Sequence, residues 1–237
     1  MPEKILKPFL SSGEAARIPI GCCIDDILDG GIETKIITQV YGPSGSGKTN
    51  LCLQVAVNVV RAGKKVIFID TEGGRSVDRL KQIARKDFKA VLDNSYFYEP
   101  PTFEDQNFII ENLDKVINEE FGLIVVDCAV SLYRIGTDEE KATSMNRMLS
   151  KQFAKLGELA RKHNLAVIIT NQVYSSFEDG GVEPIGGSIL KYWSKAVVEL
   201  KKENFNKREA VLRRHRSLPE DISVKFVITN EGLRDAR

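Results

Sequence analysis

Histidine, cysteine and long apolar runs are scarce in this sequence of 237 residues, and each scarcity excludes a class of protein. It has two histidines and four cysteines, and no two cysteines have C-x-x-C spacing, which argues against a structural zinc site and favours a reduced intracellular protein. No stretch approaches the roughly 20 apolar residues that span a bilayer. No apolar run follows the N-terminal residues as a signal peptide requires. We therefore expect a cytoplasmic protein with no membrane partner.

Charge of one sign is also lacking, because the formal net charge is only +1 while 28% of the residues are charged. A strong overall bias in charge would indicate a nucleic-acid or membrane partner, and this sequence has none. Without such a bias, any nucleic-acid partner must be met by a local patch.

One glycine-rich segment dominates what is present. Residues 42–49 read GPSGSGKT and match the pattern G-x-x-x-x-G-K-[ST] at every fixed position. Residues 35–41 predict a strand and residues 50–61 a helix, so the context is that of a phosphate-binding P-loop rather than a glycine-rich turn with a stray lysine. In a P-loop, Lys48 reaches the β- and γ-phosphates and the Thr49 hydroxyl ligates Mg²⁺. The expected nucleotide-binding residues here are Gly42, Pro43, Ser44, Gly45, Ser46, Gly47, Lys48, Thr49 and Asn50.

Strand and helix patterns alternate along most of the chain, which predicts an α/β fold with a mostly parallel central sheet and helices on both faces. Three later strands should extend this sheet in antiparallel fashion. We expect an N-terminal arm over residues 1–20 and one core domain over residues 21–237, with a loop at 173–187. The predicted strands are residues 35–41, 64–70, 95–98, 123–127, 165–170, 197–201, 209–213 and 224–228, and the predicted helices are residues 50–61, 76–86, 102–121 and 138–163.

Polar residues follow several of the predicted parallel strands, at the sheet edge where ligands of such folds bind. Asp127 ends an apolar strand and has the form of a Walker B acid, which would hold Mg²⁺ through water or through Thr49. The alternative is a buried strand that merely stops at an aspartate. Glu72 and Gln172 follow two other strands of the same set.

The order of these motifs resembles the RecA/RadA recombinase family, and most closely its short archaeal paralogues, over residues 18–235. The motifs are the P-loop, DTEGG at 70–74, VVD at 125–127, ITNQV at 169–173 and PIGG at 184–187. The resemblance implies a RecA-like ATPase core with ATP and Mg²⁺ as cofactors. It implies that Glu72 is the general base, that Gln172 senses the γ-phosphate, and that Arg79 stacks on adenine. The alternatives are a solvated loop acid, an amide that ends a strand and an ordinary surface arginine.

The resemblance also implies DNA-binding loops over residues 128–137 and 173–187, with Tyr133, Arg134 and Tyr174 as candidate contacts. The aromatic rings could instead pack beneath their loops. A separate basic run spans residues 201–216, with seven bases against two acids, and could track a DNA backbone or form a solvated sheet edge. Its bases are Lys201, Lys202, Lys207, Arg208, Arg213, Arg214 and Arg216.

The chain departs from the family at two places that bear on activity. The family's helix-hairpin-helix domain is not found, and residues 1–20 contain no convincing Phe-x-x-Ala segment of the kind that links filament subunits. Arg214 occupies the position of an acidic residue that caps the neighbouring subunit's ATP, so we expect slow ATP turnover.

The sequence thus predicts an ATP- and DNA-binding recombinase paralogue, with weak ATP hydrolysis, that is accessory to the main recombinase in DNA repair and homologous recombination. The resemblance implies single-stranded DNA, the main archaeal recombinase RadA and a Holliday-junction resolvase as candidate partners, and leaves self-association open. The alternatives are a ring-forming ATPase of helicase or clock type and a non-hydrolytic ATP-binding regulatory module.

Overall fold

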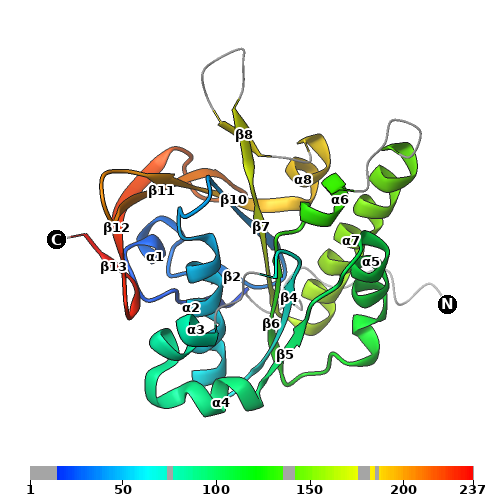
Figure 1. The fold of residues 1–237 in the computed structure, drawn as a ribbon, viewed down its shortest axis with the longest axis horizontal. Coiled ribbons are helices and arrows are strands. Elements are labelled where there is room, and N and C mark those ends of the chain that lie inside the picture. Colours follow the sequence, from blue (N-terminus) through cyan, green and yellow to red (C-terminus); the bar gives the residue numbers. More distant parts are fainter. Residues whose placement is uncertain (1–14, 74–76, 136–141, 176–181, 185–186, 237) are drawn as a thin grey trace.

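A nine-stranded sheet with helices on both faces forms the centre of the protein (Figure 1). The computed structural model describes residues 15–73, 77–135, 142–175, 182–184 and 187–236. The strand order is β13-β12-β11-β10-β3-β7-β6-β4-β5. The strands β3, β7, β6, β4 and β5 are mutually parallel neighbours, as the alternating pattern predicts. They are β3 (Ile37–Tyr41), β7 (Ala166–Asn171), β6 (Phe121–Asp127), β4 (Lys65–Asp70) and β5 (Ser95–Tyr98).

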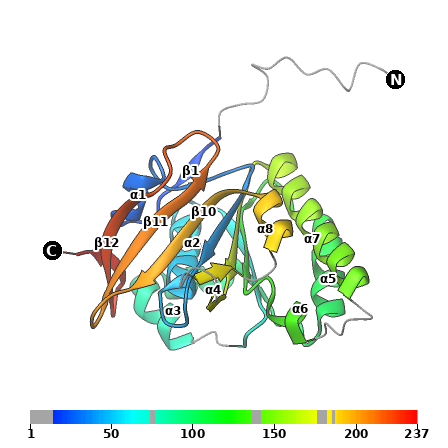
Figure 2. The same ribbon diagram turned by 90° about the horizontal axis from the view of Figure 1, so that it is seen from above.

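The other half of the sheet is a series of antiparallel strands at the C-terminal end of the chain. β10 runs parallel to β3 and antiparallel to β11, and β12 and β13 continue the antiparallel pairing. In Figure 2 these strands lie at one end of the molecule, opposite α5 and α7. The predicted fold class is confirmed, and β13 is one strand more than the sequence predicted. The strands are β10 (Ser194–Lys202), β11 (Lys207–His215), β12 (Ile222–Thr229) and β13 (Gly232–Asp235).

Alternate residues of each parallel strand pack into two separate cores. In β4, Val66 and Phe68 belong to one core while Ile67 and Ile69 belong to the other. This is why the parallel strands are continuously apolar, since both faces are covered. One core lies under α1 (Ile24–Ile27), α2 (Lys48–Arg61), α3 (Val77–Ala84) and α4 (Phe88–Asp93). The other lies under α5 (Phe103–Asn112), α6 (Ser131–Ile135), α7 (Ala142–His163) and α8 (Gly187–Trp193).

Helix α2, which follows the P-loop, is tied to both ends of the described chain. The buried Gln54 side chain donates to the carbonyl oxygen of Ile20 at 2.7 Å and accepts from the backbone N–H of Leu233 at 2.7 Å. Ile20 is fully buried. Short strands β1 (Arg17–Ile18) and β2 (Ile32–Glu33) pair beside it. The arm predicted for residues 1–20 stays a prediction, because residues 1–14 lie outside the described residues.

Three predicted segments differ from the structure. The helix predicted over 102–121 begins as expected, because the Thr102 hydroxyl accepts a hydrogen bond from the N–H of Asp105 at 3.1 Å, but it ends in a 3₁₀ turn at Leu113–Lys115. The helix predicted over 76–86 continues through a second 3₁₀ turn into α4. The loop predicted over 173–187 contains paired strands β8 (Val173–Ser175) and β9 (Val182–Pro184). The predicted helix starts at 76 and 138 lie outside the described residues.

Among the described helices, none combines the length and the apolar character that crossing a membrane demands.

Candidate nucleotide-binding site

The P-loop joins the end of β3 to the start of α2 and is pressed against the antiparallel strands. Gly42 is buried with φ +154°, and a Cβ there would lie 2.1 Å from the carbonyl oxygen of Leu200 in β10. No side chain fits that space, so glycine is required by packing as well as by backbone conformation. Gly47, which precedes the first residue of α2, has φ +110° and lies against Ile228 of β12. The loop is therefore held by its neighbours on the sheet.

Lys48 lies inside the loop rather than in solvent. Its ammonium donates to the carbonyl oxygens of Gly42 at 2.8 Å and Pro43 at 3.1 Å. Burial lowers the pKa of Lys48, and the negative charges of Asp127 and Glu72 oppose part of that shift. The ammonium of Lys48 thus interacts electrostatically with both carboxylates.

The groups that surround the loop fit a nucleotide with its metal ion. The Ser46 hydroxyl oxygen is buried and has no hydrogen-bond partner in the described chain, so an oxygen-rich ligand would satisfy it. Backbone N–H groups of a helix N-terminus favour phosphate. Within the described residues, no three His, Cys, Asp or Glu side chains cluster as metal ligands. Mg²⁺ suits such a site because it takes few protein ligands and keeps phosphate and water oxygens.

Asp127 and Thr49 are brought together as the sequence predicts for a Mg²⁺ site. The Thr49 hydroxyl donates to one carboxylate oxygen of Asp127 at 2.7 Å, and the Thr170 hydroxyl donates to the other. Burial raises the pKa of Asp127, while these two hydrogen bonds favour its charged form. Thr170 was not identified from the sequence. Thr170 could have been identified by its position near the end of β7, because β7 is the strand next to β6 and β6 ends at Asp127.

Glu72 and Gln172 meet at the same edge of the sheet. The Asp70 carboxylate accepts from the backbone N–H groups of Glu72 at 3.1 Å and Gly73 at 3.0 Å, which fixes the loop after β4. The side-chain amide of Gln172, after β7, donates to the carboxylate of Glu72. The structure therefore brings together the four groups expected to act on the γ-phosphate, which are Lys48, Glu72, Asp127 and Gln172.

Arg79 of α3 connects the start of α2 to the turn between β12 and β13. Its guanidinium donates to the Asn50 side chain, to the carbonyl oxygen of Thr229 at 2.8 Å and to that of Asn230 at 3.2 Å. Burial lowers the pKa of Arg79. Its expected stacking on adenine stays a prediction.

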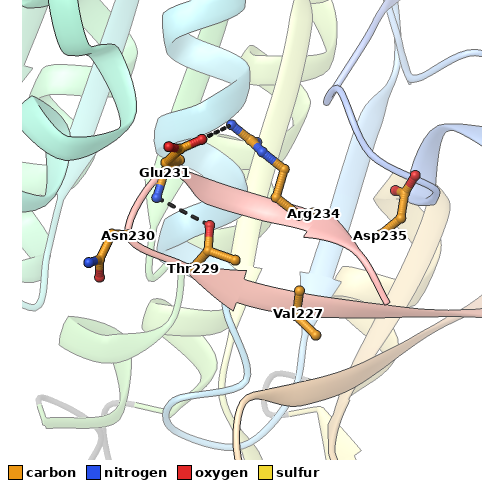
Figure 3. A pocket seen from close by; sticks show the side chains of 6 residues that line it. All are labelled: Val227, Thr229, Asn230, Glu231, Arg234 and Asp235. Carbon is orange, nitrogen blue, oxygen red and sulfur yellow. Dashed lines mark hydrogen bonds and ion pairs between the residues drawn. The ribbon is translucent and has the colours of Figure 1, made fainter. Parts of the chain in front are cut away.

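A cleft of about 880 Å³ opens beyond this turn (Figure 3). No P-loop residue lines it, so it is separate from the phosphate site. Its walls are formed by Val227, Thr229, Asn230, Glu231, Arg234 and Asp235.

The basic run at 201–216 divides into two groups, and the first is held by internal contacts. Arg213 pairs with Glu199 at 2.7 Å and with Asp221 at 2.6 Å. Arg214 donates to the carbonyl oxygens of Lys191 and Ser194. Arg216 pairs with Glu33, and Lys201 with Glu209 at 3.5 Å. These four bases do not form one open patch.

The second group lies at the turn of the β10–β11 hairpin, next to the P-loop. Lys202 ends β10 and Lys207 begins β11, and both are exposed. Arg208 donates to the carbonyl oxygen of Gly45 in the P-loop at 3.0 Å and 3.1 Å. This contact was not predicted from the sequence.

The candidate DNA contacts in the two loops are placed differently from one another. The Tyr133 ring of α6 packs edge-on against Phe103, with 5.7 Å between ring centroids, and its hydroxyl donates to Asn146 at 2.8 Å. Arg134 is exposed. Tyr174 lies in β8, opposite Glu183 of β9. Residues 136–141 and 176–181 lie outside the described residues.

The chain is similar to known proteins along nearly all of its length. A model of the Rad51 family matches residues 14–236. The DNA repair and recombination protein RadB of Methanobrevibacter smithii is 44% identical over 224 residues, covering 92% of this chain and 95% of that protein. RadB of Methanothermobacter thermautotrophicus is 43% identical over 235 residues, covering 96% and 100%.

A solved structure extends the likeness to three dimensions. The crystal structure of the RadB recombinase has a TM-score of 0.81 and 35% identity, and covers 93% of this chain and 100% of that one. The expected resemblance to a short archaeal paralogue of the RecA/RadA recombinases is confirmed. These matches span nearly all of the chain and include the P-loop and the strand ends around it, and they show that the chain belongs to the Rad51 family.

Proposed function

We propose that this chain is an ATP- and DNA-binding recombinase paralogue that assists the main recombinase in DNA repair and homologous recombination and hydrolyses ATP slowly. The observation that carries the proposal is the convergence of Lys48, the Thr49–Asp127 pair and the Glu72–Gln172 pair at one edge of the sheet. Relatives that the chain matches along most of its length are named for DNA repair and recombination, which supports the biological role.

The residues around the P-loop supply each part that phosphoryl transfer to water requires. The loop's backbone N–H groups and Lys48 bind the phosphates. Thr49 and Asp127 would hold Mg²⁺, which when bound neutralises charge on the phosphate oxygens. Glu72, fixed by the turn at Asp70, accepts the proton of the attacking water.

Gln172 supplies the switch. Its amide donates to Glu72, and the chain leads from it directly into β8 and β9, the segment expected to contact DNA. An amide that exchanges Glu72 for a phosphate oxygen would shift the start of that segment. In this way nucleotide state would set the affinity for single-stranded DNA, and DNA would by reciprocity set the affinity for ATP.

Slow turnover follows from the environment of Arg214. Its guanidinium is directed to the carbonyl oxygens of Lys191 in α8 and Ser194 at the start of β10, and it carries the opposite charge to the acid expected at this position. A neighbouring subunit would therefore receive no acidic cap from this segment. Turnover equal to that of a full-length RadA-type enzyme under the same conditions would contradict this part of the proposal.

Membership of the Rad51 family favours the recombinase paralogue over a helicase-type or clock-type ring and over a non-hydrolytic module. The decisive experiment measures ATP turnover without DNA, with single-stranded DNA and with duplex DNA, beside Lys48→Ala. We expect slow turnover that single-stranded DNA changes and that Lys48→Ala abolishes. Turnover indifferent to both DNA and the substitution would refute the proposal.

We propose protein partners that take part in homologous recombination. Candidates are the main archaeal recombinase RadA, a Holliday-junction resolvase and a second copy of this chain. Light scattering with and without ATP and single-stranded DNA tests self-association. Pull-down with each purified protein, with and without ATP, tests the other two.

A further inference from the structure

The turn of the β10–β11 hairpin lies against the P-loop of the same chain. β10 runs parallel to β3 with Glu199 opposite Tyr41, so β10 continues past the first residue of the P-loop. The hairpin then returns with Arg208 opposite Lys202, the last pair before the turn. Two cations are thereby brought to a loop that binds anions.

Arg208 connects the P-loop to the hairpin turn. Its Nε and Nη2 atoms donate to the carbonyl oxygen of Gly45 at 3.1 Å and 3.0 Å, and its Nη1 atom donates to the carbonyl oxygens of Phe205 at 2.9 Å and Lys207 at 2.8 Å. A planar guanidinium with several fixed donors can span these groups, and a lysine cannot.

The peptide unit after Gly45 is held at both of its polar atoms. Its carbonyl oxygen accepts from Arg208, while its N–H, which belongs to Ser46, donates to the carbonyl oxygen of Pro43 at 3.1 Å. Gly45 itself has φ +73°, a conformation that glycine adopts freely. Because glycine is otherwise mobile, this external contact restricts the loop to one shape.

Lys202 places a second cation at the same point. A Cβ built on Gly45 would lie 3.3 Å from both Cε and Nζ of Lys202, so the ammonium is adjacent to the loop. Within the described part of the chain Lys202 forms no ion pair, whereas Lys201 pairs with Glu209. The nearest acid in the turn, Glu203, is occupied by Lys225 at 2.7 Å. The charge of Lys202 is thus uncompensated beside the phosphate site.

We propose that the end of the β10–β11 hairpin forms a second wall of the phosphate site. Arg208 is a positioning residue that holds the P-loop through Gly45, and Lys202 binds the terminal phosphate of a nucleoside triphosphate. The inference rests on the proposed function, since it places the nucleotide at the P-loop.

The two residues have different expected effects. Lys202 acts on a group that a triphosphate has and a diphosphate lacks, so its removal weakens ATP binding selectively. Arg208 acts through the shape of the loop, which both nucleotides use, so its removal weakens ATP and ADP binding alike. A purely structural arginine would alter neither affinity.

The test is equilibrium binding of fluorescently labelled ATP and ADP, with Mg²⁺, to the full chain. For Lys202→Ala we expect ATP affinity to fall about tenfold, the loss of one charge-assisted hydrogen bond, and ADP affinity to change by less than about twofold. For Arg208→Ala we expect both affinities to fall by a similar factor. Arg208→Lys should not restore them, because its single ammonium lacks the fork.

Lys195→Ala is the matched control. Lys195 is exposed at the opposite end of β10, beside the start of β3, and donates to the carbonyl oxygen of Tyr192 at 3.0 Å. The Lys195→Ala substitution removes the same charge from the same strand, but away from the P-loop. The affinities for ATP and ADP should therefore stay unchanged. Thermal denaturation of each variant checks that it is folded.

Three results would overturn the inference. The first is a Lys202→Ala affinity for ATP that matches the control. The second is full recovery by Arg208→Lys, which would show a nonspecific charge effect. The third is loss of single-stranded DNA affinity with nucleotide affinity unchanged, which would return both residues to the DNA-binding set. Lys48→Ala separates the two proposals. If Lys48→Ala binds ATP normally, the proposed function fails. If Lys48→Ala loses ATP binding but Lys202→Ala and Arg208→Ala retain it, the hairpin inference alone fails.

Discussion

The side-chain amide of Gln172 donates a hydrogen bond to the carboxylate of Glu72, a residue 100 positions earlier in the chain. The two residues follow β7 and β4, which are not neighbours, since β6 lies between them. The hydrogen bond therefore reaches across the end of the strand that presents Asp127. It orients the carboxylate expected to activate water and links it to the segment expected to contact DNA.

Substituting Glu72 by glutamine should separate hydrolysis from binding. Glu72→Gln keeps the size and polarity of the side chain but cannot accept a proton from water. We expect turnover to fall by roughly a hundredfold or more, as for loss of a general base, with ATP affinity retained. Phosphate release and equilibrium binding measure the two quantities. Glu104→Gln, at an exposed glutamate of α5, is the control, and unchanged turnover in Glu72→Gln would remove Glu72 from the mechanism.

The Thr49 hydroxyl should matter for Mg²⁺ more than for the fold. Thr49→Val removes the hydroxyl that bonds Asp127, while Thr49→Ser retains it. We expect Thr49→Val to raise the Mg²⁺ concentration needed for half-maximal turnover by about tenfold or more, and Thr49→Ser to remain near the parent protein. A Mg²⁺ titration of ATP turnover makes the comparison. Equal behaviour of valine and serine would exclude a metal-binding role.

Gly42 and Gly157 should respond to alanine in opposite directions. At Gly42 the added Cβ would lie 2.1 Å from the Leu200 carbonyl oxygen, so the P-loop or β10 must move. We expect Gly42→Ala to lose ATP binding and about 1–3 kcal/mol of unfolding free energy. At Gly157, within α7, the nearest contact is 3.4 Å, and alanine should stabilise the helix by up to about 1 kcal/mol. Urea denaturation of both variants tests this, and a stable, ATP-binding Gly42→Ala would contradict it.

Removing Arg213 should destabilise the protein before it affects DNA binding. Arg213 is the ion-pair partner of Glu199, whose side chain is only 5% exposed. Arg213→Ala leaves that carboxylate buried without a partner, and we expect a loss of about 1–3 kcal/mol in unfolding free energy. Lys207→Ala, at an exposed position of the same strand, should leave stability unchanged. Denaturation curves should accompany any measurement of DNA affinity on variants of Arg213, Arg214 and Arg216. A fully stable Arg213→Ala would show that the pair contributes nothing.

His215 should make stability depend on pH. Burial, reinforced by the charge of Arg17, lowers the pKa of His215 below its ordinary value of 6.5. The carboxylate of Glu33 lies 3.4 Å away, but it is already paired with Arg17 and Arg216 and so does little to hold a proton on the ring.

At pH values between the folded and the unfolded pKa of His215, the unfolded chain binds a proton that the folded protein does not. This difference in proton binding favours unfolding. The stabilising effect of His215 is therefore present above about pH 6.5 and is lost as the pH falls toward the folded pKa. The unfolding free energy at pH 7.5 and 5.5 measures the effect. His215→Gln should show a smaller difference between the two, and an unchanged difference would assign the effect to other groups.

The site was predictable where chemistry is local in sequence. The P-loop is contiguous, and the ends of parallel strands must meet at one edge, so Glu72, Asp127 and Gln172 could be gathered without coordinates. The basic run was less predictable. Its residues look alike in sequence, but Arg216 pairs with Glu33, 183 positions away. Arg213 reaches Glu199 only because β10 pairs with β11.

Register explains what else was missed. The contact of Arg208 with Gly45 depends on the pairing of β10 with β3, a contact between residues 163 positions apart. The helix predicted over 102–121 was too long because Ile117 and Phe121 are apolar at helical spacing, yet both enter the core beyond the end of the helix. The backbone that brings these two side chains into the core was not predicted.

The hydrogen bonds of Gln54 make the ends of the described chain reporters of the ATP site. One side chain on the P-loop helix holds the carbonyl of Ile20 and the N–H of Leu233. Anything that stiffens the start of α2 should therefore slow proteolysis and amide exchange near both ends, although neither end touches the phosphates. An affinity tag or fusion at either end of this protein should therefore be tested for its effect on nucleotide binding.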